Sequence, residues 1–290
     1  MTSNFDLFFP KFSRESASSS DAERRVFDIL KSYAQTSSTT TAESVANEID
    51  VLYPTNPATG TIDYMTLEHL WELFVGIAEQ IPWTDSAQDK LVEVLKALRD
   101  LPQQRSMVID HWEKEPVKIW ADIPVLPYVL SDGVETHGVI INDESEAEKQ
   151  SRIRDLNFQG FAARLTNAKI FDLSRLAVYR IRSVLEDDAD YYITGYDDVG
   201  THLDVNILPA QVWIDLTSKL LYDLCQENGA GAARNDIAGG KHWKGAAGFS
   251  RARWDFWKQK LDEIAENDKA KEETRKTARK MKATMLAAEA

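Results

Sequence analysis

The sequence predicts an all-α protein, an irregular bundle of about eight to ten helices. Three observations predict it. Apolar residues recur at helical spacing over most of the chain. Hydroxyl or acidic residues precede several of these segments, where such side chains cap helix starts. Proline and glycine fall mainly between the segments, where they interrupt helices without breaking their interiors.

The first half of the chain predicts four helices. Ser20–Glu23 and Thr40–Glu43 match the capping-box pattern before the first two. A broad apolar face predicts a third helix over about 62–81. Asp85 and Gln88 mark the start of the fourth. The predicted core residues of these helices include Val26, Leu30, Val45, Ile49, Leu67, Trp71, Phe74, Leu91, Leu95 and Leu98.

Between Pro102 and Asn142 the helical period fades, and we expect a proline-rich, poorly periodic segment packed as ordered coil. Residues 139–141 are compatible with a short extended piece. Beyond this segment, helices are predicted around Phe161, around Leu176 and after Pro209, which we place in a first helical turn. The last helical region begins at Ser250 and places Trp254, Trp257, Leu261 and Ile264 on one stripe.

This pattern predicts a flexible N-terminal segment over residues 1–19, a single all-α domain over 20–265 and a charged helical extension over 266–290. The chain has no uninterrupted apolar run of about 18 residues, so no membrane span is expected. Its N-terminus does not resemble a secretory signal. The single cysteine, Cys225, suits a reducing compartment. We therefore predict a cytoplasmic protein.

The net charge of −13 argues against nucleic acid as a partner. The charge is uneven, because residues 251–290 contain eleven basic and eight acidic residues while the rest of the chain is strongly acidic. Mixed charge at this density is typical of a solvated helix, which we favour here over a docking arm for polyanions.

Two stretches resemble a known family. They are Leu156–Thr166, with the pattern NFxxFAARLT, and Gly248–Lys258, with the pattern GFSxxRWxFWK. Both are similar to a family of mostly helical, uncharacterised proteins from filamentous fungi, a domain of unknown function. The resemblance extends loosely over most of the chain. It implies a helical fold and a fungal source, and it implies no activity.

The acidic run Asp187-Asp188-Ala189-Asp190 invites comparison with the magnesium-binding motif of terpene synthases, which are also helical. That motif requires an acid where this chain has Tyr191, and a second metal-binding pattern is missing from the sequence. We interpret the acids as a solvated helix end.

The glycine-rich stretches do not match nucleotide-binding loops. Gly229–Arg234 lacks the third glycine of a dinucleotide loop, and Gly239-Gly240-Lys241 is followed by His242 where a phosphate loop needs Ser or Thr. We expect these glycines to permit turns with positive φ. The histidines show no compact zinc spacing, and Cys225 lies on an apolar helical face, which predicts a buried, unreactive thiol. No cofactor is predicted.

The remaining candidates are the aromatic and arginine residues of the family-like stretches. We expect Trp254 and Trp257 to pack in the core. At least one of Arg164 and Arg253 should bridge helices by pairing with an acid distant in sequence, because arginine is rarely buried without a carboxylate. The alternative is a clamp for an anionic ligand in a tryptophan-walled cleft. That ligand site would contain Arg164, His242, Trp243, Arg253 and Trp257.

Two functions remain open. The first is a helical scaffold or protein-interaction module without recognisable catalytic chemistry, whose partner is another protein. The second is a binding protein or enzyme of fungal specialised metabolism that takes a small apolar or anionic ligand in a cleft lined by Trp and Tyr. A deep, mainly apolar pocket favours the second. A filled interior with exposed apolar surface favours the first.

Overall fold

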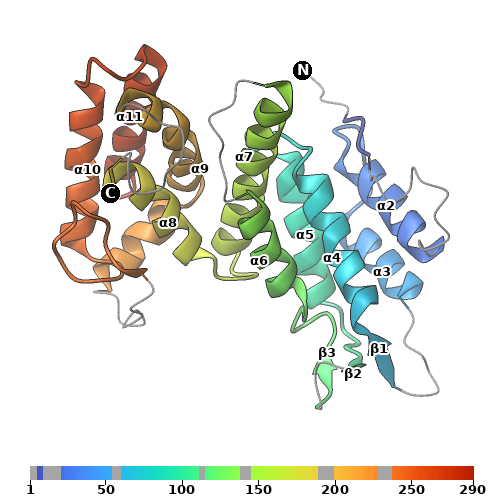
Figure 1. The fold of residues 1–290 in the computed structure, drawn as a ribbon. Helices are drawn as coiled ribbons and strands as arrows, with labels where there is room; N and C mark the ends of the chain where they lie inside the picture. Colours follow the sequence, from blue (N-terminus) through green and yellow to red (C-terminus); the bar gives the residue numbers. More distant parts are fainter. Residues whose placement is uncertain are drawn as a thin grey trace. The chain divides into compact units, whose positions relative to one another are not determined.

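The computed structural model describes residues 5–8, 21–53, 60–110, 115–137, 145–188, 199–227 and 237–290. In these ranges it contains ten α-helices and three short strands. The predicted all-α, multi-helix fold is therefore confirmed. The chain forms two compact units, Met1–Val139 and Ile140–Ala290, shown in blue to green and in green to red in Figure 1.

The predicted single domain over 20–265 stays a prediction, because two compact units can still unfold together as one domain. Limited proteolysis of the full chain tests it. A stable fragment ending near residue 139 would contradict it.

The first unit contains five helices, which pack around an apolar core. Helix α2 contacts α3, α4 and α5, and α4 also contacts α6. Their bounds are α2 Asp21–Ala34, α3 Ala42–Leu52, α4 Tyr64–Ala78, α5 Ala87–Arg99 and α6 Leu126–His137. The predicted inward-facing residues of the first four, from Val26 to Leu98, are buried.

The helix starts follow the capping signals to within a residue or two. Thr41, and not Thr40, is the N-cap of α3, and its side chain accepts a hydrogen bond from the Ser44 amide. Asp85 accepts a hydrogen bond from the Ala87 amide at the start of α5. Ser20, in the first predicted cap, lies outside the described residues.

The central segment was predicted as coil, and this is wrong in two respects. It contains helix α6, in which Pro127 occupies the first turn, where a missing amide costs little. It also contributes two of three strands of a small sheet. Strand β1 (Thr61–Asp63) pairs in parallel with β2 (Ser106–Asp110), which pairs antiparallel with β3 (Val117–Lys118).

The backbone preferences of single residues do not predict helix α6, because the residues that precede it adopt unfavourable φ values. Ile123 and Val125 adopt φ values of 44° and 71°, which β-branched residues rarely do. Both side chains are buried. The indole of Trp71 fixes the same turn by donating a hydrogen bond to the Pro124 carbonyl at 2.7 Å. Tertiary packing therefore decides the conformation here.

At the N-terminus, only residues 5–8 are described. Leu7 is buried, the Phe5 amide donates to the Gln35 side chain at 2.9 Å, and the Phe8 amide donates to Gln80 at 2.8 Å. The serine-rich part of the predicted flexible segment lies outside the described residues. So does the predicted extended piece at 139–141.

The second unit is built around one long helix. Helix α9 contacts every other helix of this unit. The helices are α7 Glu146–Asn167, α8 Ser174–Leu185, α9 Val199–Gln226, α10 Arg251–Ala265 and α11 Glu272–Ala287. Trp213, Trp254 and Trp257 are completely buried, as predicted for the last two. The unit therefore has a filled aromatic core.

Pro209 does not lie in a first helical turn, as predicted, but inside α9. The helix begins ten residues earlier, at Val199. Proline in a helix interior removes one backbone hydrogen bond. The buried side chains on both sides of it, Ile207 and Val212, show that packing holds the helix across this break.

Helix α11 packs against α9 and α10 with Ala278, Met281 and Met285 buried. Its start is capped from α9, because Asp204 accepts a hydrogen bond from the Lys271 amide at 3.0 Å. Lys280 and Lys282 pair with Asp215 of α9 and Asp262 of α10. The basic residues of this helix thus lie on a solvated face, as predicted, and many of them pair with acids of the same unit.

Candidate functional site

Three consecutive acids follow helix α8, and we call Glu186, Asp187 and Asp188 the acidic cluster. The side chains of Glu186 and Asp187 are fully buried, whereas 32% of the Asp188 side chain is exposed. The prediction of a solvated helix end is therefore wrong for Asp187. Asp190, the last acid of that motif, lies outside the described residues.

A loop from the distant Gly239-Gly240-Lys241-His242 stretch covers the cluster. The Gly240 amide donates to Glu186 Oε2 and the Lys241 amide to Asp187 Oδ1, both at 2.8 Å. The His242 amide donates to the Glu186 carbonyl at 2.7 Å. These amides replace water as the hydrogen-bond donors, which is why the two carboxylates can be buried.

Close approach, and not positive φ, explains the glycine at position 240. A Cβ atom there would lie 2.5 Å from Asp187 Oδ1 and 2.6 Å from Glu186 Cβ, closer than real contacts allow. At Gly239 a Cβ would lie 2.3 Å from the Trp243 ring. Neither glycine has a φ in the left-handed region, so the predicted role was wrong for this pair. Gly229 and Gly231 lie outside the described residues.

Arg253 forms a bidentate ion pair with Glu186 inside the unit. Its Nε lies 2.7 Å from Glu186 Oε1, and its Nη2 lies 2.9 Å from Oε2. The remaining donor, Nη1, binds the carbonyls of Ile237 and Gly248. Both charged side chains are completely buried. The predicted ion pair between an arginine of the family-like stretches and a distant acid is thus confirmed.

Trp257 is a further hydrogen-bond donor to Glu186. Its indole Nε1 donates to Glu186 Oε1 at 2.5 Å, and the Arg253 guanidinium lies 5.5 Å from its ring centre. Glu186 therefore accepts hydrogen bonds from a backbone amide, a guanidinium and an indole. A buried carboxylate with this many donors is fully satisfied.

Asp187 and the partly exposed Asp188 are also paired. Asp187 Oδ2 accepts from Arg182 Nε at 2.9 Å. The Lys241 ammonium and the His242 ring both bind the Asp188 carboxylate. These two hydrogen bonds hold the pKa of Asp188 below its usual value.

A cavity of about 420 Å³ lies beside the acidic cluster. Polar groups from the cluster, the covering loop and α10 line it together with apolar side chains of α8, α9 and α10. The lining residues are Val184, Leu185, Asp187, Asp188, His202, Leu203, His242, Lys260, Glu263, Ile264 and Asn267. Lys260 and Glu263 pair with each other at 2.6 Å.

His202 is a buried titratable group of this cavity. Its Nε2 donates to the Ser183 carbonyl at 2.9 Å, because a carbonyl can only accept. Its Nδ1 is then the acceptor for the Asn206 side-chain amide at 3.3 Å. Burial lowers the pKa of His202, and the neutral ring fits both contacts.

The structure brings together three of the five predicted ligand-site residues, His242, Arg253 and Trp257, around the acidic cluster. Trp243 lies in the same loop, where its ring packs 5.4 Å from that of Phe256. Arg164 is buried in α7 and donates to Gly160 of its own helix. Their assignment to a ligand site stays a prediction.

Sequence reasoning did not assign a site role to Glu186, Asp187, Asp188, Arg182, Lys241 or His202. The sequence contains an acidic run and a Gly-Gly-Lys-His stretch, and neither matches a known binding motif by itself. No local pattern indicates that the two stretches, more than 50 residues apart, bind each other.

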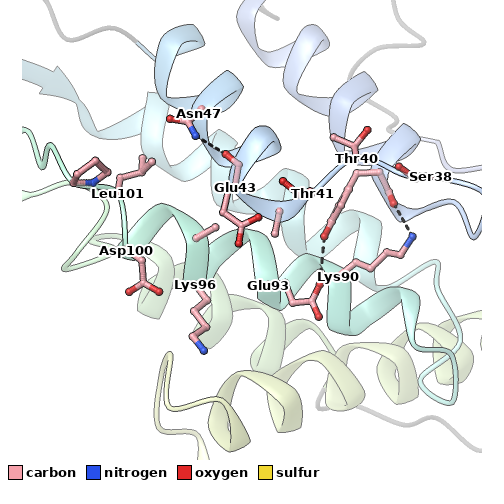
Figure 2. Close-up of a pocket in the computed structure, with 14 residues that line it drawn as sticks. Ser38, Thr40, Thr41, Glu43, Asn47, Lys90, Glu93, Lys96, Asp100 and Leu101 are labelled. Carbon is pink, nitrogen blue, oxygen red and sulfur yellow. Dashed lines mark hydrogen bonds between the residues drawn. The ribbon is translucent and has the colours of Figure 1, made fainter.

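The first unit has a larger cleft, of about 700 Å³, between α3 and α5 (Figure 2). It contains the carboxylates of Glu43, Glu93 and Asp100 and the ammonium groups of Lys90 and Lys96. Two of these groups, Glu93 and Lys90, have hydrogen-bond partners nearby. Tyr33 donates to Glu93 at 3.3 Å, and Lys90 binds the Tyr33 and Gln35 carbonyls. Burial, followed by the charge of Glu93, raises the pKa of Tyr33 to about 12.

Among the described residues, we find no group of three or more His, Cys, Asp or Glu side chains placed to hold a metal ion. No described helix is long and apolar enough to cross a membrane. In the described part of this mostly helical chain, the acidic cluster joins α8 to the Gly239–His242 loop and to α10.

A model of a family described as Protein of unknown function (DUF3632) matches residues 71–261. This is more than half of the chain, so the protein belongs to that family. The two stretches that suggested an uncharacterised helical family both lie within the matched range, and membership of such a family is confirmed. The fungal source stays a prediction. Neither a curated protein nor a solved structure matches the chain.

Proposed function

We propose that this protein is a helical protein-interaction module that performs no chemistry at the acidic cluster. One observation supports the proposal. The carboxylates of Glu186, Asp187 and Asp188 accept hydrogen bonds from amides, guanidinium groups, an ammonium group and rings of the chain itself. A catalytic acid or base must instead reach a substrate within hydrogen-bond distance.

The packing of the aromatic residues supports the same proposal. A ligand cleft walled by tryptophans requires indole rings at a cavity surface. Trp213, Trp254 and Trp257 are completely buried, and Trp254 and Trp257 pack against each other with ring centres 6.3 Å apart. Meanwhile, large apolar side chains such as Val51, Met65 and Tyr128 are exposed. Exposed apolar surface of this kind is common where proteins bind one another.

A small-molecule site remains the second candidate, because one cavity combines polar and apolar groups. The 420 Å³ cavity is large enough for a small ligand. His242 and Asp188 line it, and so does His202, whose pKa is lowered by burial. A metabolite and nucleotide library screened by thermal shift tests this candidate, since a ligand that binds the folded state raises the melting temperature.

Site-specific photo-cross-linking tests the main proposal. Benzoylphenylalanine replaces, one at a time, the exposed apolar residues Val51, Met65 and Tyr128, and the exposed polar residues Lys276 and Glu273 serve as controls. Irradiation in cell extract should produce a discrete protein adduct from at least one apolar position and none from the controls. Equal labelling at every position, together with a specific hit in the thermal-shift screen, would favour the small-molecule function.

We also propose a cytoplasmic location. The support is the single thiol, Cys225, which is buried without a disulfide partner, as suits a reducing compartment. Subcellular fractionation of the tagged full chain tests it, and recovery in a secreted fraction would contradict it.

A further inference from the structure

The loop that covers the acidic cluster is closed at its base. It consists of residues 237–248, and we call it the Trp243 loop. The Gly248 amide donates to the Ile237 carbonyl at 3.1 Å, and Arg253 Nη1 donates to the carbonyls of both residues. Three amides in the middle of the loop bind the acidic cluster. The loop is thus fixed at two places while residues 244–247 are exposed. Compact loops with closed ends are frequently functional.

Inside this loop, two glycines make room for the indole of Trp243. A Cβ atom at Gly239 would lie 2.3 Å from Trp243 Cδ1, and one at Gly245 would lie 2.2 Å from Cζ2, so a larger residue at either position would displace the ring. The indole Nε1 donates to the Ala246 carbonyl at 2.9 Å, and the ring packs against Phe256. The loop therefore sets the position of a tryptophan that is only partly buried.

The loop contains no acidic residue. Residues 237–254 are the longest stretch of the sequence without Asp or Glu, although the chain has 47 acids, and this stretch contains four basic residues. Lys241 and Lys244 flank His242 and Trp243. One carboxylate, Asp188, pairs with both Lys241 and His242. In the part of the chain that the structure describes, Lys244 pairs with no acid, and its ammonium binds the Lys241 carbonyl. The loop therefore carries positive charge on both sides of its tryptophan.

Helix α10, which contacts the loop through Phe256, has its own acids already paired. Asp255 lies 3.0 Å from Lys258, Glu263 lies 2.6 Å from Lys260, and the third acid of the helix pairs with a lysine of α11. The Lys260 ammonium also lies 5.6 Å from the centre of the Phe256 ring. The surroundings of the loop thus contain aromatic rings and cations, with acids that are held by neighbouring lysines.

These features favour a partner of particular chemistry. Tryptophan is enriched among the few interface residues that carry most of the binding energy, and a ring held in place beforehand loses little entropy on binding. Lysines on both sides attract carboxylates and orient an acidic ligand. An extended polyanion such as nucleic acid or an anionic membrane fits less well, because the protein as a whole carries a charge of −13. A short acidic segment contacts only the loop and its surroundings.

We infer that the Trp243 loop binds an acidic segment of a partner protein. An apolar side chain of that segment packs on Trp243, and its carboxylates lie beside Lys241 and Lys244. This inference rests on the proposed function and names the surface and the chemistry of the partner. It also gives the acidic cluster a role, because Glu186 and Asp187 hold the loop that presents the tryptophan.

A labelled peptide tests the inference. It has about nine residues, roughly 30 Å when extended, with Phe at the centre and Glu or Asp on both sides. Its binding to the full chain is followed by the fluorescence anisotropy of a fluorescein label. A peptide with Lys for every acid and one with Ser for Phe are the ligand controls. Only the acidic peptide with Phe should bind tightly, and its Kd should rise with salt, since the charges lie at the surface.

Variants then localise the binding. Trp243→Ser should raise the Kd at least about tenfold, as the loss of a central aromatic contact does. Leu286→Ser, at an exposed apolar site on α11, is its control and should leave the Kd unchanged. Lys244→Glu should raise the Kd at least about threefold by repelling the ligand. Lys276→Glu, the same charge reversal at an exposed lysine of α11, should have little effect.

Gly245→Ala tests whether the position of the ring matters, because it removes no group that could contact the peptide. The added Cβ displaces the Trp243 ring, so the Kd should rise at least about threefold. An unchanged Kd would contradict the role given to the two glycines and would overturn the inference. Circular dichroism of each variant should match that of the unmodified protein.

Several other results would also overturn the inference. They are the absence of peptide binding, equal effects of a loop variant and its control, and displacement of the peptide by phosphatidylserine vesicles or single-stranded DNA. The first unit of a second copy is acidic too, with 22 acidic and 11 basic residues over 1–139. A dimer in light scattering that Lys244→Glu abolishes would therefore identify a second copy as the partner.

Failure of the inference can be distinguished from failure of the proposed function. If cross-linking gave discrete protein adducts from Val51, Met65 or Tyr128 while the loop variants bound the peptide like their controls, the interaction function would stand and the Trp243 loop would be rejected.

Discussion

The buried ion pair makes a sharp prediction for Glu186→Gln. The substitution keeps the size of the side chain but removes its charge and replaces one acceptor oxygen with an amide group. Every hydrogen bond to the Glu186 carboxylate comes from a donor: the Gly240 amide, two Arg253 nitrogens and the Trp257 indole. The new amide must therefore face a donor, and Arg253 keeps a buried charge without a counter-ion.

The expected cost follows from the burial of both partners. Removing one member of a buried ion pair typically costs about 3–5 kcal/mol, because the other charge stays buried and uncompensated. Glutamine retains one acceptor, so we expect about 3 kcal/mol, the lower end of this range. Glu186→Ala should reach the upper end. The double variant Glu186→Gln/Arg253→Met removes both charges. Its loss of unfolding free energy should be smaller than the sum of the losses in the two single variants.

Urea unfolding followed by far-ultraviolet circular dichroism measures these differences. Hydrogen exchange of the α10 amides assigns them to the second unit. Lys282→Ala is the control, since its ion pair with Asp262 lies at the surface. It should cost no more than about 1 kcal/mol. A cost for Glu186→Gln as small as that of the control would refute the interpretation that this pair joins the loop to α8 and α10.

Four other predictions follow from single residues. Lys169 lies just after α7 with a φ of 56°, in a motif where the Ile170 amide donates to the Leu165 carbonyl. Lys169→Gly should therefore stabilise the protein by about 0.5–1 kcal/mol in urea, whereas Lys169→Ala, which keeps the strained Cβ, should not. Trp254→Ala should cost about 3–5 kcal/mol, since its ring is completely buried; an unchanged melting temperature would contradict this. Burial raises the pKa of Cys225 to about 12, so a thiol reagent at neutral pH should react only after unfolding, and fast labelling of the native chain would oppose this assignment. Burial lowers the pKa of His202, so the unfolded state takes up a proton first as the pH falls below about 6.5, and stability should decline there. In His202→Gln the decline should be shallower, and an identical pH profile would count against it.

Most helices could be predicted because their signal is local. Apolar residues three and four apart share a helix face, so Val26, Leu67, Leu91 and Trp254 could be assigned to the core from spacing alone. The cap at Ser250 also follows from a local rule, and its side chain accepts a hydrogen bond from the Arg253 amide. The pairing of Arg253 with some acid was predictable, because a buried guanidinium needs a carboxylate.

The missed elements depend on contacts distant in sequence. Helix α6 and its entry through Ile123 and Val125 contradict local backbone preference and are held by burial and by the Trp71 hydrogen bond. Helix α9 crosses Pro209 because its flanking side chains are packed. The strands are too short, at two to five residues, to show a period of their own.

The sequence by itself determined the fold class, most helix positions, the aromatic core of the second unit and the excess of acid in the first. These depend on composition and on spacing within a few turns. Only the tertiary structure decided which acid Arg253 binds and why position 240 is glycine. Each of these depends on segments that meet only when the chain is folded, and the energy of a buried charge depends on the donors that then surround it.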